Sequence, residues 1–173
     1  RMPKGRSVGS RSLPAMILRS RFVITMQGQP IDDGGVVVAD GRILEVGSFA
    51  EVQANHPGEV TDLGESALLP GLINAHCHLD YTCLRHRLPA ASSFTGWILS
   101  INAAKAGLTP NDYVASINQG FIEAKRFGTV ALANLTAFPE LIPRVDLLIR
   151  TTWFAELIDV RRPHQADAMI ERA

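Results

Sequence analysis

The sequence predicts an α/β protein in which a small antiparallel β-domain precedes a series of parallel βαβ units. In the first part, short runs rich in valine and isoleucine are separated by turn sequences. After that part, apolar strand-like runs alternate with helical patterns, which is typical of a parallel sheet. We therefore divide the chain into residues 1–15, a basic leader expected to be disordered, residues 16–66, the β-domain, and residues 67–173, the alternating part.

The β-domain is predicted from three short segments, residues 16–26, 34–39 and 42–47, which are rich in residues that favour strands. Asp40-Gly41 separates the last two segments, and Asp-Gly between apolar residues is a strong signal for a two-residue hairpin turn. We therefore expect neighbouring strands of this domain to be antiparallel.

The alternating part begins with a long apolar strand that runs to residue 78. Residues 94–105 have a helical pattern, and Thr109-Pro110 combines an N-cap residue with a proline at the first helical position. We expect this second helix to run to about residue 127 and to end at Gly128. Two further strands are predicted at residues 129–135 and 148–158, with a last helix beginning near residue 163.

Composition and charge narrow the functional classes. The chain has 173 residues, 46% of them apolar, and a formal net charge of zero, which argues against a nucleic-acid partner. No apolar run approaches the roughly 18 residues of a membrane span. The two cysteines, Cys77 and Cys83, are too few for a disulfide framework and fit a reducing compartment. These features predict a cytoplasmic protein with no membrane partner.

The first 21 residues carry six basic and no acidic side chains. Such a start is compatible with an organelle transit peptide or with a tail that is not part of the folded protein. We favour the second interpretation, because the first strand pattern begins afresh at Met16.

His76 and His78 form the clearest candidate for a functional site. Side chains two residues apart in a strand point to the same face, so both imidazoles can hold one ion while Cys77 points away and packs. Imidazole suits Zn, Fe, Ni or Cu, and the carboxyl ends of parallel strands are where α/β folds place their chemistry. Taken alone, the pair is weak evidence for a metal, because two histidines on one face can simply be hydrogen-bonded to their neighbours.

The surrounding stretch, LLPGLINAHCHLDYTCLR, resembles the first-strand signature of the amidohydrolase superfamily, and more narrowly of its deaminase and chlorohydrolase branch. The similarity extends from about Met16 to the end of the chain, and within the branch it is strongest to aminodeoxyfutalosine deaminase-like proteins. The positions that carry the signature are Pro70, Gly71, Ile73, Asn74, His76, His78, Leu79 and Arg85.

The resemblance implies a (β/α)8 TIM-type barrel, of which this chain would hold a partial version, the first three βα units. It also implies one divalent metal ion, Zn or Fe, held by His76 and His78 together with a later histidine and an aspartate of the last strand. The ion would activate water to attack an sp² carbon and release ammonia from an amino-substituted heterocycle or nucleoside. Since about 250 residues make a full barrel, we expect the chain to be the N-terminal part of such an enzyme and to be inactive alone.

Asp80, Arg85 and Glu156 are the predicted substrate-binding residues, and no catalytic residue is assigned. Each has an alternative: Asp80 can be a turn carboxylate or orient a ligand, Arg85 can be solvated, and Glu156 can pair with a nearby arginine. Trp97 is expected to pack in the core. Gly96 stands where nucleoside-binding relatives carry a glutamate for the ribose, which argues against nucleoside recognition by that route.

Two other functions stay open from the sequence. The chain can be a non-catalytic remnant or interaction module that self-associates or needs a complementing C-terminal chain, because part of a barrel exposes a strand edge and apolar helix faces. It can also belong to a chlorohydrolase or a cyclic-amide hydrolase, which the first strand does not exclude.

Overall fold

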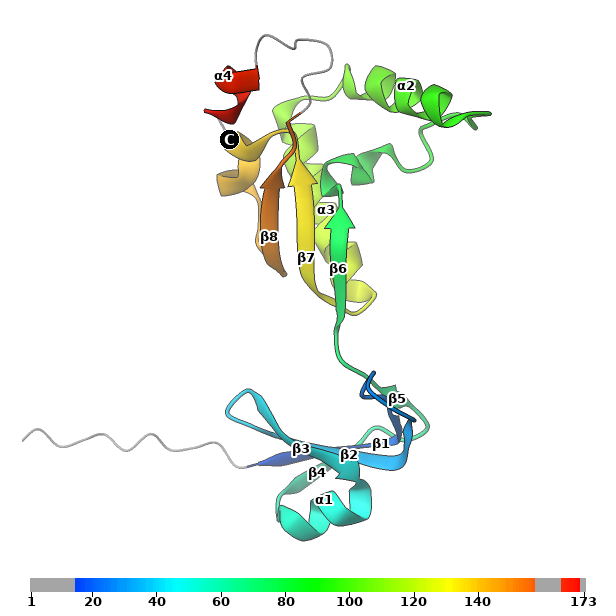
Figure 1. The fold of residues 1–173 in the computed structure, drawn as a ribbon, viewed down its shortest axis with the longest axis vertical. Coiled ribbons are helices and arrows are strands. Elements are labelled where there is room, and N and C mark those ends of the chain that lie inside the picture. Colours follow the sequence, from blue (N-terminus) through cyan, green and yellow to red (C-terminus); the bar gives the residue numbers. More distant parts are fainter. Residues whose placement is uncertain (1–14, 158–165, 172–173) are drawn as a thin grey trace, which may run out of the picture. The chain divides into compact units, whose positions relative to one another are not determined.

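The computed structural model describes residues 15–157 and 166–171. These residues form two compact units, which divide after Pro70 (Figure 1). The predicted basic leader lies outside the described residues apart from Ala15. Within the described part of the chain, no helix is long and apolar enough to cross a membrane.

The N-terminal unit is a five-stranded sheet with one helix. Its strands follow the order β3-β2-β1-β4, with β5 also paired to β1. The first three strands are antiparallel, as predicted, whereas β4 and β5 lie parallel to β1. The elements are β1 (Met16–Val23), β2 (Ile31–Ala39), β3 (Arg42–Ser48), α1 (Phe49–Asn55), β4 (Glu59–Asp62) and β5 (Ala67–Leu68).

The predicted hairpin between β2 and β3 is confirmed. Asp40 and Gly41 have φ angles of 49° and 72°, and two positive values are what a type I′ turn requires. Residues 67–68, which the sequence assigned to the alternating part, pair with β1 instead. The division between the units therefore falls after Pro70.

Helix α1 was not predicted. Its N-cap is Ser48, whose hydroxyl accepts a hydrogen bond from the backbone N–H of Glu51 and donates one to the Glu51 carboxylate. A serine followed three residues later by glutamate is a helix-start signal that could have revealed it. The helix buries Val52 against Ile17 and Val37, which together form the core of this unit.

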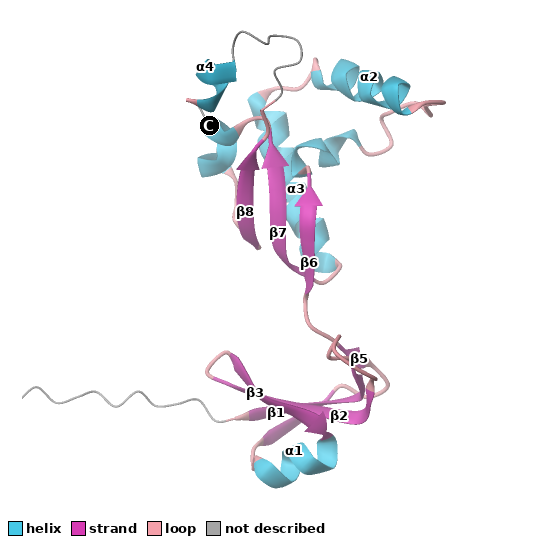
Figure 2. Ribbon diagram, in the orientation of Figure 1, coloured by secondary structure: helices cyan, strands magenta, loops and turns pink. Residues whose placement is uncertain are grey.

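The C-terminal unit contains a parallel three-stranded sheet in the order β6-β7-β8 (Figure 2). The predicted long strand ran to residue 78, but in the structure only Leu72–Cys77 form β6. Helix α2 has the predicted bounds. The elements are β6 (Leu72–Cys77), η1 (Leu79–Leu84), α2 (Phe94–Lys105), α3 (Pro110–Arg126), β7 (Thr129–Thr136), η2 (Pro139–Arg144), β8 (Arg150–Ala155) and α4 (Ala166–Ile170).

Helix α3 covers one face of the parallel sheet (Figure 1). It begins with the predicted cap, in which Thr109 and Asp112 exchange side-chain and backbone hydrogen bonds, and it ends before Gly128, whose φ is 82°. Its buried side chains meet those of η1, β7 and the segment before β8. The resulting core consists of Leu79, Ile117, Phe121, Leu132 and Ile149.

Candidate metal site and pocket

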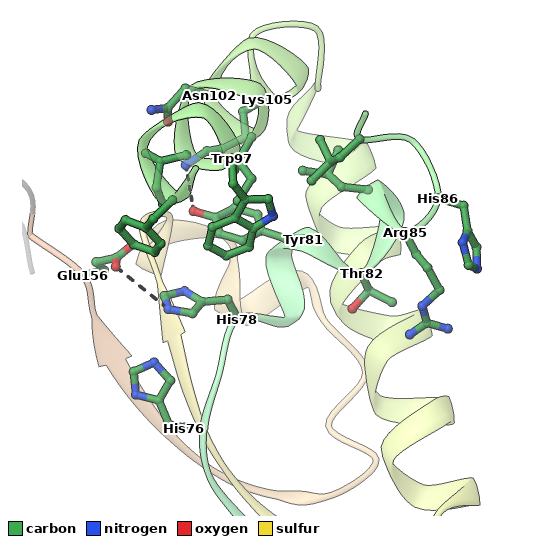
Figure 3. A pocket seen from close by; sticks show the side chains of 15 residues that line it. His76, His78, Tyr81, Thr82, Arg85, His86, Trp97, Asn102, Lys105 and Glu156 are labelled. Atoms are coloured by element: carbon green, nitrogen blue, oxygen red, sulfur yellow. Dashed lines mark hydrogen bonds and ion pairs between the residues drawn. The ribbon is translucent and has the colours of Figure 1, made fainter. Parts of the chain in front are cut away.

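The two histidines lie at the carboxyl end of β6. His76 is exposed and His78 is half-buried. Their ring centroids are 5.4 Å apart and their planes are inclined by 69°. Figure 3 shows both rings on the same side of the strand, as the alternation of strand side chains predicts.

Cys77, between the histidines, packs against the core of the C-terminal unit. Its thiol lies 3.5 Å from the carbonyl oxygen of Ala133 and 3.5 Å from the side-chain oxygen of Asn134. Burial, assisted by the charge of Asp80, raises the pKa of Cys77 to about 11. This packing, and not a contact with the pocket, is the role that the structure gives Cys77.

The turn η1 directly follows the histidines and was not predicted. The backbone N–H of Leu79 donates to the buried side chain of Asn134 over 2.8 Å. The hydroxyl of Ser116 on α3 donates to the Leu79 carbonyl and accepts from the N–H of Cys83, each over 2.9 Å. These partners lie 33 to 55 residues away in the sequence. No pattern of neighbouring residues could therefore predict the turn.

Gly120 on α3 allows η1 to approach closely. A Cβ atom at this position would lie 2.7 Å from the Thr82 hydroxyl and 2.9 Å from a methyl group of Leu79. Such distances are shorter than van der Waals contact, so only glycine fits without movement of the turn. The position of η1, and with it the end of β6, is therefore set by α3.

A pocket of about 1100 Å³ opens beside the histidines. One wall is formed by α2 and is largely apolar, and the others come from the end of β6, from η1 with the loop that follows, and from the end of β8. The lining residues are His76, His78, Tyr81, Thr82, Leu84, Arg85, His86, Leu88, Phe94, Trp97, Ile98, Ile101, Asn102, Lys105 and Glu156.

Glu156, one of the predicted substrate-binding residues, lies beside His78. Its carboxylate lies 4.0 Å from Nε2 of His78, and both side chains line the pocket (Figure 3). The parallel register of β6, β7 and β8 produces this proximity, because it brings the carboxyl ends of the three strands to one edge of the sheet.

Arg85 lines the same pocket but lies on its opposite side. Figure 3 shows Arg85 and His86 away from His76, His78 and Glu156. The guanidinium forms an ion pair with Glu123 on α3 and lowers the pKa of that carboxyl. Arg85 therefore has a structural partner in addition to its predicted contact with substrate.

Asp80 is fully buried and does not line the pocket. Burial raises the pKa of its carboxyl, while the Thr136 hydroxyl, the Ala137 backbone and the charges of His78 and Lys105 act in the opposite direction. Both carboxylate oxygens are buried without a hydrogen-bond partner among the described residues, and the side chain does not border the space where a substrate fits.

Trp97 corrects an expectation from the sequence. It was expected in the core, but its side chain is 44% exposed and lines the pocket. Helix α2 has no buried residue, so its apolar face borders the pocket and solvent.

The histidine pair is a partial donor set for a metal ion. Within residues 15–157 and 166–171, no group of three or more His, Cys, Asp or Glu side chains is arranged to hold an ion. Two imidazoles at one strand end, with a carboxylate 4.0 Å from one of them, nevertheless fit the donor chemistry of zinc or iron. A complete coordination shell needs further ligands beyond this pair.

Comparison with known proteins links the chain to hydrolytic deaminases. Residues 34–58 match the family model of the imidazolonepropionase-like composite domain of bacteria. The chain is 34% identical over 125 residues to 5-methylthioadenosine/S-adenosylhomocysteine deaminase of Nitratidesulfovibrio vulgaris. The aligned residues make up 69% of this chain and 28% of that protein. It is 31% identical over 131 residues to 5′-deoxyadenosine deaminase of Methanococcoides burtonii, and this alignment spans 72% of this chain and 29% of that protein. The chain thus spans less than a third of these curated relatives.

Solved structures of the same kind share the fold. Helicobacter pylori aminofutalosine deaminase in complex with methylthio-coformycin superposes with a TM-score of 0.69 at 20% identity, over 91% of this chain and 40% of that chain. Atrazine chlorohydrolase from Arthrobacter aurescens, complexed with zinc, superposes with a TM-score of 0.66 at 20% identity, over 81% of this chain and 35% of that chain. The predicted resemblance to the deaminase and chlorohydrolase branch is confirmed, and the structure aligns with the N-terminal part of these hydrolase structures.

Proposed function

Because this chain is related to the deaminases of the amidohydrolase superfamily, we propose that it is the N-terminal part of a metal-dependent hydrolase that deaminates an amino-substituted heterocycle. His76 and His78 bind one divalent ion, Zn or Fe. The observation that carries the proposal is the placement of both imidazoles at the carboxyl end of β6, beside a pocket of about 1100 Å³. The zinc bound to the related chlorohydrolase supports zinc in particular.

In this proposal, some residues of the chain bind the metal ion and others bind and orient the substrate. When bound, the ion supplies a Lewis acid that activates water for attack on an sp² carbon. The apolar wall of α2 contacts the flat ring of the substrate and excludes water. Glu156 accepts hydrogen bonds from polar substituents of the ring. Arg85 contacts the substrate from the opposite side of the pocket, where it also pairs with Glu123, and the buried Asp80 is not in contact with the substrate.

In this proposal the three strands β6, β7 and β8 are the first three of a (β/α)8 barrel. The ligands and the acid/base groups that complete the reaction come from strands beyond these three. The chain alone then binds metal weakly and has no hydrolase activity. Ammonia release from aminopurines by the purified, zinc-loaded chain should stay at the level of the buffer, and steady release would contradict this part of the proposal.

Zinc affinity tests the site directly. The dissociation constant would be measured by competition with a chromogenic chelator for the unchanged chain and for His76→Ala and His78→Ala. We expect each substitution to weaken binding at least about tenfold, since two imidazoles provide the ligands. His86→Ala is the matched control, because His86 lines the opposite side of the pocket. Equal affinity in all four proteins would contradict the metal site.

A second candidate function is that of an interaction module that requires a second chain. It is favoured by large apolar side chains exposed on the parallel sheet, including Ile73 at 73%, Val130 at 55% and Phe154 at 50%. Native mass spectrometry would show a dimer or a complex with another polypeptide if this function applies. A single species with the mass of one chain, 18.8 kDa, at every protein concentration tested would contradict it.

A further inference from the structure

We propose that Tyr81 and Lys105 are a pair of positioning residues that hold the imidazole of His78 in one orientation. The inference deepens the proposed function, because it rests on His78 being a metal ligand. It concerns a contact between η1 and the end of α2, two elements that the histidine signature does not link.

The backbone of η1 places Tyr81 beside His78. His78 is the N-cap of this 3₁₀ turn, and its carbonyl oxygen accepts a hydrogen bond from the N–H of Tyr81 over 3.1 Å. Side chains three residues apart in a 3₁₀ turn are eclipsed. Accordingly, the two rings are nearly parallel, with an interplanar angle of 8° and a centroid distance of 5.6 Å, which is offset stacking.

Lys105 fixes Tyr81 in turn. Its ammonium group donates a hydrogen bond to the phenol oxygen over 2.7 Å and lies 4.6 Å from the centre of the ring. The tyrosine is thereby held at its hydroxyl end, where the same ammonium group makes the hydrogen bond and the contact with the ring. Lys105 is the last residue of α2, so the contact also ties that helix to the site (Figure 3).

The pair is not needed to hold η1 itself. The turn is held by its hydrogen bonds with Asn134 on β7 and Ser116 on α3, and by the buried side chains of Leu79 and Leu84. Tyr81 and Lys105 are both half-buried and line the pocket. Their contact therefore acts mainly on the ring of His78.

His78 has a specific need for such support. A metal-binding histidine is normally oriented by a hydrogen bond from its second ring nitrogen. In His78, Nδ1 is buried and has no hydrogen-bond partner among the described residues, while Nε2 faces Glu156. Stacking on Tyr81 supplies the restraint that the missing hydrogen bond would otherwise give, and it keeps Nε2 directed into the pocket.

Two readouts test this pairing on the full chain. The first is the NMR shift of the His78 ring protons without metal, where a stacked tyrosine produces an upfield ring-current shift. The second is the zinc dissociation constant. Tyr81→Leu should remove the ring-current shift and weaken zinc binding about tenfold. Tyr81→Phe should keep most of both, because the aromatic ring is retained.

Lys105→Met should reduce the ring-current shift and weaken zinc binding by a few-fold, because the ring of Tyr81 then loses its anchor. The matched control is Lys125→Met, which removes an exposed lysine near the end of α3 and should change neither readout. Lys105→Met also keeps the test informative if Tyr81→Leu does not fold, which circular dichroism would reveal.

The outcomes separate this inference from the proposed function. A His78 ring without a ring-current shift, or equal zinc affinity in Tyr81→Leu, Lys105→Met and the unchanged chain, would overturn the positioning role. Failure of the unchanged chain to bind zinc would instead contradict the metal site. In that case the ring-current comparison, which needs no metal, still decides whether Tyr81 orients His78.

Discussion

The middle strand of the N-terminal sheet and the histidine-bearing strand of the C-terminal sheet are buried to very different degrees. Strand β2 lies between β1 and β3 and has four consecutive buried residues, 34–37. Strand β6 lies at an edge of its sheet, and its residues 72–76 are all exposed. Packing along the strand therefore holds β2 in place, but it contributes little to β6.

The difference shows where the geometry of the candidate site comes from. At the end of β6, the chain is held by the hydrogen bonds of Asn134 and Ser116 and by the close approach of η1 to Gly120. These partners lie on β7 and α3. The positions of His76 and His78 thus depend on the helix that covers the sheet more than on their own strand.

The largest expected effect comes from removing the central side chain of this support. Phe121 is fully buried on α3 and meets Trp153 edge to face with ring centroids 6.2 Å apart. Phe121→Ala should lower the free energy of unfolding of the C-terminal unit by about 3–5 kcal/mol, through lost burial and the cavity left behind. Amide hydrogen exchange, followed separately in each unit, would measure it.

Its matched control is Ile122→Ala on the same helix. Ile122 is 53% exposed, so this change should stay within about 0.5 kcal/mol. Protection in β1 and β2 should not change in either variant. If Phe121→Ala destabilised both units equally, the contrast between separately supported sheets would be wrong.

The sequence predicted best what local signals determine. The hairpin at Asp40-Gly41, the bounds of α2 and the cap at Thr109 each depend on residues a few positions apart, and all three were found. The turn η1 and the exposure of Trp97 were missed. The first depends on partners more than 30 residues away, and the second on how α2 borders the pocket.

The candidate site was predictable only as far as one strand. The alternation of side chains placed His76 and His78 on the same face, but their roles as ligands stay a prediction. The approach of Glu156 to His78 follows from the register of three parallel strands, which sequence spacing does not specify. The contact of Lys105 with Tyr81 joins residues 24 positions apart and carried no signal in the sequence.

A smaller effect should follow from Gly120→Ala, which sharpens the comparison by moving η1 without emptying the core. The added methyl group would meet Thr82 and Leu79 at 2.7 and 2.9 Å. Overpacking costs more than the helix gains from alanine, so we expect a net loss of about 1–2 kcal/mol. Zinc affinity should fall as well, because the end of β6 shifts with the turn.

Thermal unfolding and the chelator competition would report these two effects. Gly107→Ala is the control, since the nearest atom to its added Cβ is 4.0 Å away. Unchanged zinc affinity in Gly120→Ala, together with the expected loss of stability, would show that η1 does not transmit the position of α3 to the histidines.

Thr109→Ala should have a still smaller effect. The threonine hydroxyl accepts from the backbone N–H of Asp112 over 3.3 Å and donates to its carboxylate over 2.7 Å. Loss of an N-cap side chain costs about 1 kcal/mol. The change should appear in chemical denaturation of the C-terminal unit, and Thr109→Ser, which keeps the hydroxyl, should recover most of it. No difference between the alanine and serine variants would mean that α3 is held by its packing alone.

The smallest expected effect is a pH dependence of the same cap. Hydrogen bonds from the hydroxyl and the backbone N–H of Thr109 hold the pKa of Asp112 below its ordinary value of 3.8. A lowered folded-state pKa means that the carboxylate stabilises the helix fully above the unfolded pKa, and that this contribution is lost as the pH falls through the folded value. The difference in unfolding free energy between the unchanged chain and Asp112→Asn should therefore be constant from pH 7 to about pH 5 and shrink below about pH 4.

Glu59→Gln, an exposed change in the N-terminal unit, should leave exchange protection in α3 unaltered over the same range. A difference that grew on acidification would show that the protonated carboxyl, and not the carboxylate, caps α3.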